Sequence, residues 1–118
     1  MTKKYLDELT HRIIGAAIEV HKALGPGLLE SVYQKCSEHE YSLQGISFQS
    51  ELPVPIIYKG VKLETDFRAD FFIEEIMVVE FKAVQELLPI HEAQLLTYMK
   101  LLKAPKGIII NFCKCSGK

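Results

Sequence analysis

Charged residues inside two short apolar segments are the feature that most limits how this chain folds. Residues 68–82 form two apolar segments joined by an acidic pair, with Asp70 in the first segment and Glu80 and Lys82 in the second. Side chains alternate along a strand, so Glu80 and Lys82 share one face. If the two strands pair, Asp70 is brought beside them. Because burying three charges in a sheet is costly unless they pair or hold a metal, this stretch predicts a functional site.

The composition is that of a globular domain. The chain has 118 residues, of which 48% are hydrophobic and 25% are charged, and this composition argues against a disordered chain. We therefore expect a single domain over residues 1–118, with a flexible polar tail at 113–118. The net charge of −1 provides no overall basic field for nucleic acid, although a local basic patch is compatible with it.

Cysteine usage and the absence of targeting segments predict a cytoplasmic protein with no membrane partner. The three cysteines are odd in number and have no zinc or redox spacing, as expected for a reduced chain. The N-terminal residues contain no signal peptide, and no apolar run approaches the ~20 residues of a membrane helix.

Hydrophobic periodicity predicts three helices, over residues 5–24, 28–44 and 89–102. Gly25 is expected to end the first helix. For the second helix we expect a buried stripe, which comprises Leu29, Val32, Tyr33, Cys36, His39 or Glu40, and Leu43.

Extended segments fill the chain between the second and third helices. They lie at 48–58, 61–63, 65–73 and 76–82, with a hairpin turn at Lys59-Gly60, and a last strand at 107–112 follows the third helix. The order is therefore ααββββαβ. Because a helix joins the last two strands, we expect them to be parallel within a mixed sheet that is flanked by helices, an α/β fold.

The charged strands resemble a known nuclease core. Asp70 followed by Glu80-Phe81-Lys82 on the next strand matches the core of the PD-(D/E)xK nuclease superfamily. Residues 27–33, Gly-Leu-Leu-Glu-Ser-Val-Tyr, fit the Gly-x-x-Glu-x-x-Tyr signature of one family within it, the GxxExxY family. Further segments that resemble this family follow in its order, at residues 19–26, 58–60, 68–70, 79–83, 92–98 and 110–112, so the resemblance covers nearly the whole chain.

This resemblance implies a restriction-endonuclease-like fold and a Mg²⁺- or Mn²⁺-dependent nuclease. It implies that Asp70, Glu80 and Glu30 bind the metal, and that Lys82 is the catalytic lysine. Gln94, with Tyr98 one turn later, resembles the Gln-x-x-x-Tyr element of RecB-like members. The implied catalytic residues are thus Lys82, Glu80, Asp70 and Gln94. The implied substrate contacts are Gln94, Tyr98, Tyr33 and Arg68.

The residue types fit these roles chemically. Magnesium prefers hard oxygen ligands and keeps several waters, so two or three carboxylates are enough to hold it. A lysine beside the metal can orient or deprotonate a water and stabilise the charge that develops on a phosphate.

Each candidate also has an ordinary structural interpretation. Asp70, Glu80 and Lys82 can form a salt bridge at a sheet edge, and Glu30 is favoured by the dipole in the first turn of its helix. His21 is expected to be a packing or helix-end residue. His91 is expected to be a solvated residue in the first turn of its helix, with contact to phosphate as the alternative. Six scattered cations form either a basic rim for a phosphate backbone or an ordinary surface; they are Lys59, Lys62, Arg68, Lys100, Lys103 and Lys106.

The sequence therefore predicts a metal-dependent nuclease that hydrolyses phosphodiester bonds of DNA rather than RNA, with a homodimer or partner protein assisting substrate capture. The alternative is a catalytically silent module on the same fold that binds nucleic acid or protein. A third interpretation treats the charges as a buried structural network.

Overall fold

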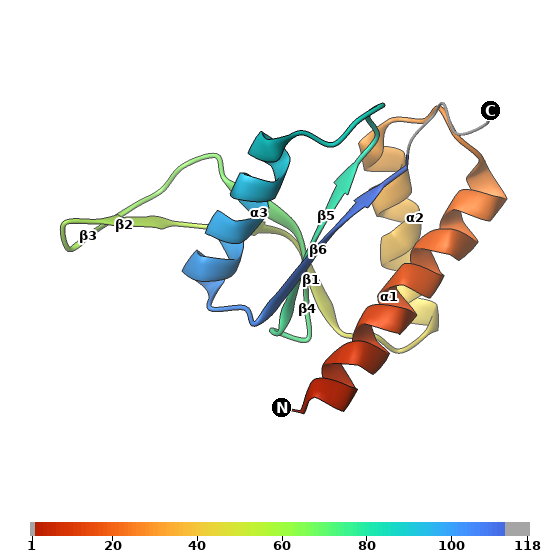
Figure 1. The fold of residues 1–118 in the computed structure, drawn as a ribbon, viewed down its shortest axis with the longest axis horizontal. Helices are drawn as coiled ribbons and strands as arrows, with labels where there is room; N and C mark the ends of the chain where they lie inside the picture. The colour runs from red at the N-terminus through yellow and green to blue at the C-terminus, as the bar shows by residue number, and fades with distance from the viewer. Residues whose placement is uncertain (1, 113–118) are drawn as a thin grey trace. The chain divides into compact units, whose positions relative to one another are not determined.

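The computed structural model describes residues 2–112, which group into two compact units (Figure 1). The described part of the first unit comprises residues 2–46, 81–86 and 110–112, and we call it the helical unit. The second comprises residues 47–80 and 87–109, and we call it the sheet unit. The predicted tail at 113–118 lies outside the described residues, and the prediction of a single domain stays a prediction.

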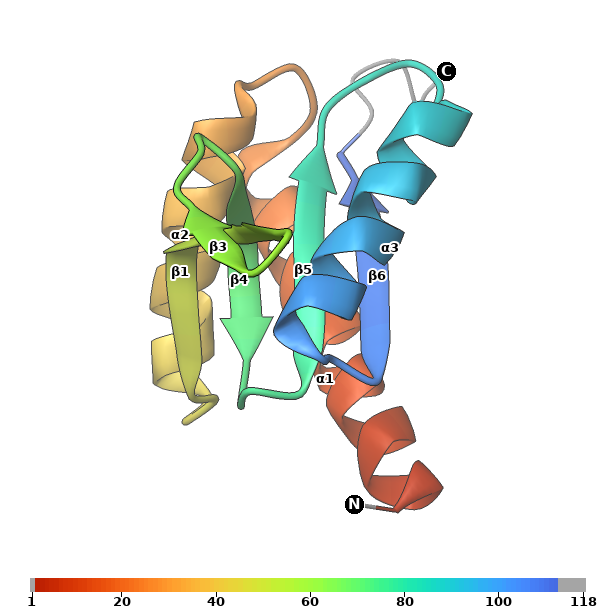
Figure 2. The ribbon, with the colours of Figure 1, turned by 90° about the vertical axis from the view of Figure 1, so that its left-hand side faces the viewer.

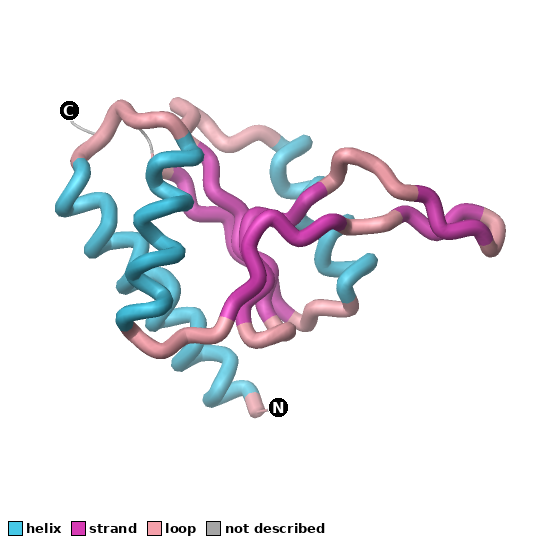
Figure 3. The backbone as a smooth tube through the Cα atoms, turned by 180° about the vertical axis from the view of Figure 1, so that it is seen from behind, coloured by secondary structure: helices cyan, strands magenta, loops and turns pink. Residues whose placement is uncertain are grey.

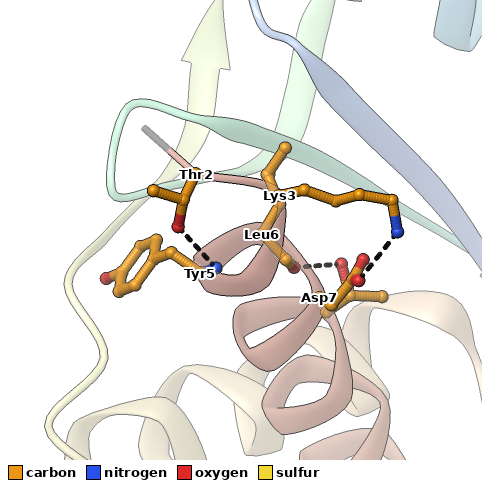
Figure 4. A network of polar contacts seen from close by, with 6 residues as sticks. Thr2, Lys3, Tyr5, Leu6 and Asp7 are labelled. Carbon is orange, nitrogen blue, oxygen red and sulfur yellow. Dashed lines mark hydrogen bonds and ion pairs between the residues drawn. The ribbon is translucent and has the colours of Figure 1, made fainter.

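The helical unit contains α1 (Lys3–Leu24) and α2 (Glu30–Leu43). Thr2 caps α1, because its hydroxyl accepts a hydrogen bond from the Tyr5 N–H at 3.1 Å, and an ion pair of 3.1 Å joins Lys3 to Asp7 one turn later (Figure 4). The helix ends where predicted, at Gly25, whose φ of 78° is accessible to a residue without a side chain.

The buried face of α2 differs from the predicted stripe. The buried residues are Tyr33, Ser37 and Tyr41, which recur every four positions, whereas Leu29 and Leu43 are 74% and 68% exposed. Tyr33 was part of the predicted stripe and is buried, whereas Ser37 and Tyr41 were not part of it. A tyrosine ring contributes a larger apolar area when its hydroxyl is accommodated, so the tyrosine stripe is the one that this helix buries.

The sheet unit is built on a four-stranded mixed sheet in the order β1-β4-β5-β6 (Figure 2). The strands are β1 (Phe48–Pro53), β4 (Arg68–Ile73), β5 (Met77–Lys82) and β6 (Lys106–Asn111), and the last residues of β5 and β6 belong to the helical unit. β4 runs antiparallel to both β1 and β5. β6 runs in the same direction as β5, as predicted, and α3 (Pro89–Leu102) joins these two strands (Figure 1).

The predicted α/β fold class is confirmed, with one strand more than the order ααββββαβ contains. The extended stretch 48–58 forms two strands, because the chain changes partner at Val54-Pro55. β1 pairs with β4, whereas β2 (Ile56–Tyr58) pairs with β3 (Val61–Leu63) in a separate hairpin (Figure 3). Proline has no N–H to donate to a ladder, which explains the break.

Helix α3 covers one face of the sheet unit's strands. Its buried residues Leu95 and Tyr98 share a hydrophobic cluster with Ala69, Phe72 and Val78 of β4 and β5. This packing places the middle of α3 over the strands that carry Asp70 and Glu80. Among residues 2–112, no helix is long and apolar enough to cross a membrane.

Candidate active site

Asp70 and Glu80 lie side by side on neighbouring strands. Phe71 pairs with Val79 in the β4/β5 ladder, and Asp70 and Glu80 are the next residues along each strand. The Asp70 N–H donates a hydrogen bond of 2.8 Å to Oε2 of Glu80. Glu80 is only 5% exposed and Asp70 is half-buried. The structure therefore confirms that these strands pair and bring the two carboxylate residues together.

The acidic turn between the strands sets this register. Glu74 and Glu75 both have positive φ, at 53° and 57°, and the Ile76 N–H bonds to the Ile73 carbonyl at 2.9 Å. Two consecutive residues with positive φ give a turn whose twist matches that of an antiparallel hairpin. A one-residue slip would move Glu80 to the opposite face of the sheet, so the turn fixes which residue faces Asp70.

Tyr98 of α3 lies close to both carboxylates. Phe72 and Val78 pack under α3, and Asp70 and Glu80 lie two positions further along the same strands, on the same face. Burial raises the pKa of Tyr98, and the charges of Glu80 and, more weakly, Asp70 raise it further, while a hydrogen bond from the Arg68 backbone acts in the opposite direction. The Tyr98 hydroxyl is thus in the electrostatic field of this pair.

Two further predicted residues lie in the sheet unit. Gln94 is half-buried on α3, one turn before Tyr98. Arg68 is exposed at the start of β4, opposite Pro53, and lines a cavity of about 330 Å³ together with Lys62 and Glu64. The sheet unit therefore contains five of the eight predicted site residues, which are Arg68, Asp70, Glu80, Gln94 and Tyr98.

The helical unit contains Glu30 and Lys82. Glu30 is the exposed first residue of α2, and its Oε2 accepts a hydrogen bond of 3.2 Å from the Ala83 N–H. Lys82 is the half-buried last residue of β5, and its carbonyl accepts a hydrogen bond of 2.7 Å from the Phe112 N–H. Glu30 therefore binds the backbone of the residue that directly follows the candidate catalytic lysine.

Tyr33 has the contacts of a structural residue. It is fully buried, and its hydroxyl donates to the Gly25 carbonyl at 2.7 Å and accepts from the Leu28 N–H at 3.3 Å. Its ring stacks on Phe112 at a centroid distance of 4.3 Å. In the Gly-x-x-Glu-x-x-Tyr segment, the tyrosine thus holds the loop that leads into Glu30. Nothing in these contacts supports the predicted role in substrate binding, which stays a prediction.

Asn111 has a positioning role that the sequence prediction missed. Its Nδ2 donates to the Val84 carbonyl at 2.9 Å, and its Oδ1 accepts from the Val84 N–H at 3.1 Å. Together with Glu30, it fixes the backbone that leaves β5 after Lys82. The sequence did contain a signal for Asn111, because this polar residue directly follows three isoleucines. A strand that serves only for packing has no need of a polar side chain at that position.

Glu51 is a second residue that the sequence prediction missed, and in its case the sequence contains no signal. It lies in β1 between Ser50, which pairs with Phe71, and Leu52, which pairs with Ala69, and so it faces the Asp70 position of β4. Its φ is 53°, a conformation that few residues other than glycine adopt, and such conformations cluster at functional sites.

The two histidines have structural contacts: His21 packs as predicted, whereas the capping role of His91 was not predicted. His91 caps α3, because its Nδ1 accepts a hydrogen bond of 3.0 Å from the Leu88 N–H. The ring of His21 packs against the rings of Tyr33 and Phe112 at centroid distances of 6.1 and 5.7 Å.

The donor atoms of the Asp70–Glu80 pair fit a hard divalent cation. Carboxylate oxygens are the ligands that Mg²⁺ and Mn²⁺ prefer, and one or two of them suffice when waters and phosphate complete the shell. Across residues 2–112, no group of three or more His, Cys, Asp or Glu side chains is arranged to hold a metal ion. A three-carboxylate centre that includes Glu30 is therefore not shown.

The comparison with protein families agrees with this geometry. The family model described as the PD-(D/E)XK nuclease superfamily matches residues 7–118. No curated protein and no solved structure shows a significant similarity to the chain. The match spans almost the whole chain, including both strands of the carboxylate pair, and the mixed sheet with its helices is consistent with the restriction-endonuclease-like fold of this superfamily. Membership indicates a nuclease-type function and an interaction with nucleic acid. The chain belongs to the PD-(D/E)XK nuclease superfamily.

Proposed function

We propose that this protein is a Mg²⁺- or Mn²⁺-dependent nuclease of the GxxExxY family that hydrolyses phosphodiester bonds of DNA. The observation that carries the proposal is the Asp70–Glu80 pair, in which a buried carboxylate is held by the backbone N–H of its acidic neighbour. A hydrogen bond of this kind orients a ligand before the metal arrives.

In this proposal, Asp70 and Glu80 supply the carboxylate oxygens that bind the cation, and Glu30 is the third acidic residue. When bound, the cation lowers the pKa of a water molecule and neutralises charge on the phosphate. Gln94 donates hydrogen bonds to the substrate without adding charge, and Arg68 and the Tyr98 hydroxyl contact the phosphate backbone.

Lys82 is assigned the role of catalytic lysine. It lies two positions after Glu80 on β5, and residues two apart on a strand point to the same face. Its ammonium group then orients the attacking water and stabilises negative charge on the phosphate in the transition state. The hydrogen bonds of Glu30 to Ala83 and of Asn111 to Val84 support this position by fixing the backbone after it.

The proposal has three further parts. The protein prefers DNA to RNA, it is located in the cytoplasm, and a second copy or a partner protein takes part in binding the substrate. A second copy or partner is proposed because a chain with a net charge of −1 offers a weak overall attraction to a phosphate backbone.

Cleavage of supercoiled plasmid DNA in Mg²⁺, Mn²⁺ or EDTA tests the proposal. We expect nicking or linearisation with either metal, none in EDTA, and none in Asp70→Asn or Lys82→Met. The matched controls, Asp66→Asn and Lys35→Met, change exposed residues outside the proposed site and keep the activity. DNA binding without cleavage in any metal would instead favour the catalytically silent module.

A further inference from the structure

The β2–β3 hairpin presents apolar side chains that the described structure leaves uncovered. Its strands pair as Ile56 with Leu63, Ile57 with Lys62, and Tyr58 with Val61. Tyr58 and Val61 are 59% and 56% exposed. The hairpin extends away from β1 and β4, which precede and follow it in the chain (Figures 1 and 3). An isolated two-stranded hairpin is marginally stable, so exposed apolar surface on one indicates an interaction.

The two faces of the hairpin differ in chemistry. Cross-strand partners share a face, so Tyr58 and Val61 lie with Ile56 and Leu63 on one face, while Lys62 lies with Ile57 on the other. Lys59 occupies the turn with a φ of 50°, and its Nζ lies 5.4 Å from the centre of the Tyr58 ring.

The charge of the hairpin favours an anionic partner. Its only charged residues over 56–63 are Lys59 and Lys62, both positive. The cavity at its base adds Arg68, with Glu64 as one opposing charge and Pro53, Val54, Pro55 and Thr65 as the remaining lining. An acidic protein surface would also be attracted to lysines. A nucleic acid in addition provides sugar and base edges for Tyr58 and a groove of suitable width, because the major groove of duplex DNA admits a two-stranded β-ribbon.

The position of the hairpin in the chain connects it to the candidate site. The strand that follows it, β4, begins at Arg68 and reaches Asp70 two residues later. A duplex bound along the hairpin and past Arg68 is therefore directed toward the strand that carries the proposed metal ligand.

We propose that the β2–β3 hairpin is a DNA-binding arm that seats in a groove of duplex DNA, with Lys59 and Lys62 on the phosphates and Tyr58 against sugar or base edges. This inference rests on the proposed function and deepens it, because it makes duplex DNA the substrate class. The arm contributes affinity and not chemistry, so its loss weakens binding without removing the metal ligands.

Fluorescence anisotropy with a labelled duplex in EDTA tests the arm. Combining Lys59→Ala with Lys62→Ala is expected to weaken binding by about tenfold or more and to reduce the slope of log K against log salt by about two. Tyr58→Ala is expected to weaken binding without changing that slope. The control combines Lys4→Ala with Lys35→Ala, which removes the same charge from exposed positions of α1 and α2 and leaves both quantities unchanged.

The outcomes separate this inference from the proposed function. Wild-type affinity in the hairpin variants overturns the arm, even if the protein cleaves DNA. Equal or tighter binding to single-stranded DNA also overturns it. If the hairpin variants instead change the mass measured by light scattering and leave DNA affinity unchanged, the occupant is a second copy and the inference is wrong. If hairpin variants lose affinity but the wild type cuts nothing in any metal, the arm stands and the nuclease proposal fails.

Discussion

At the scale of single residues, the hydrogen bond from the Asp70 N–H to Glu80 is the interaction that defines the candidate site. It depends on a register that the Glu74-Glu75 turn sets, and it orients a carboxylate that is almost entirely buried. Removing water strengthens electrostatic interactions, so a carboxylate in this position acts strongly on its neighbours. Burial raises the pKa of Tyr98, and the charge of Glu80 raises it further.

Replacement of Glu80 by Gln is therefore expected to lower the pKa of Tyr98 toward its ordinary value. Burial, the larger cause of the shift, remains, so the pKa stays above that value. The measurement is an NMR titration of ¹³C-labelled tyrosine rings. Glu92→Gln, at an exposed position in the first turn of α3, is the control and leaves the titration as in the wild type. An unchanged Tyr98 titration in Glu80→Gln would show that the two groups do not interact.

The raised pKa of Tyr98 predicts that the folded protein becomes less stable at high pH. Because the pKa of Tyr98 is raised in the folded state, its contribution to stability is complete below about pH 10, the ordinary tyrosine value, and is lost as the pH rises through the folded-state pKa. Burial also raises the pKa of Tyr41. Both tyrosines therefore make unfolding easier in alkaline solution.

At the scale of elements, the backbone that leaves β5 is held from two sides within the helical unit. Glu30 at the start of α2 binds Ala83, and Asn111 at the end of β6 binds Val84. Tyr33 in turn ties the loop before α2 to the end of α1. Glu30 and Tyr33 of the Gly-x-x-Glu-x-x-Tyr segment therefore have local structural functions besides any part in chemistry.

Tyr33→Phe is expected to lower the free energy of unfolding by about 1–2 kcal/mol, because it removes the hydroxyl that bonds to Gly25 and Leu28 in a buried position. Urea unfolding monitored by circular dichroism measures the change. Tyr58→Phe removes a hydroxyl from a side chain that is 59% exposed and serves as the control, with no change in stability expected. Equal stability of the two variants would contradict the structural role of Tyr33.

The sequence predicted the elements well because their signals are local. Pro89 and the apolar spacing of residues 95–102 marked α3, and two apolar segments joined by an acidic pair marked β4 and β5. Burial of Tyr33 was predicted, but burial of Ser37 and Tyr41 was not, because it depends on partners that are distant in sequence. The position of Asn111 against Val84 is a tertiary contact across 27 residues, and periodicity carries no information about it.

At the scale of the whole molecule, the predicted site residues divide between the two compact units. Asp70, Glu80, Gln94, Tyr98 and Arg68 belong to the sheet unit, and Glu30, Tyr33 and Lys82 to the helical unit. Strand β5 passes from one unit to the other between Glu80 and Phe81. The pairing of Asp70 with Glu80 was predictable, because a two-residue turn leaves few registers open. Glu30 as a third ligand stays a prediction, because its place in a metal site depends on how separate elements pack.

The most direct test of the central claim is a crystal structure of the protein soaked with Mn²⁺. The account predicts an anomalous peak within coordination distance, about 2.0–2.5 Å, of carboxylate oxygens from both Asp70 and Glu80. It also predicts that Glu80→Gln removes this peak while the fold is retained. Density at other carboxylates, or none beside this pair at saturating Mn²⁺, would contradict the proposal that Asp70 and Glu80 form the metal centre of a nuclease.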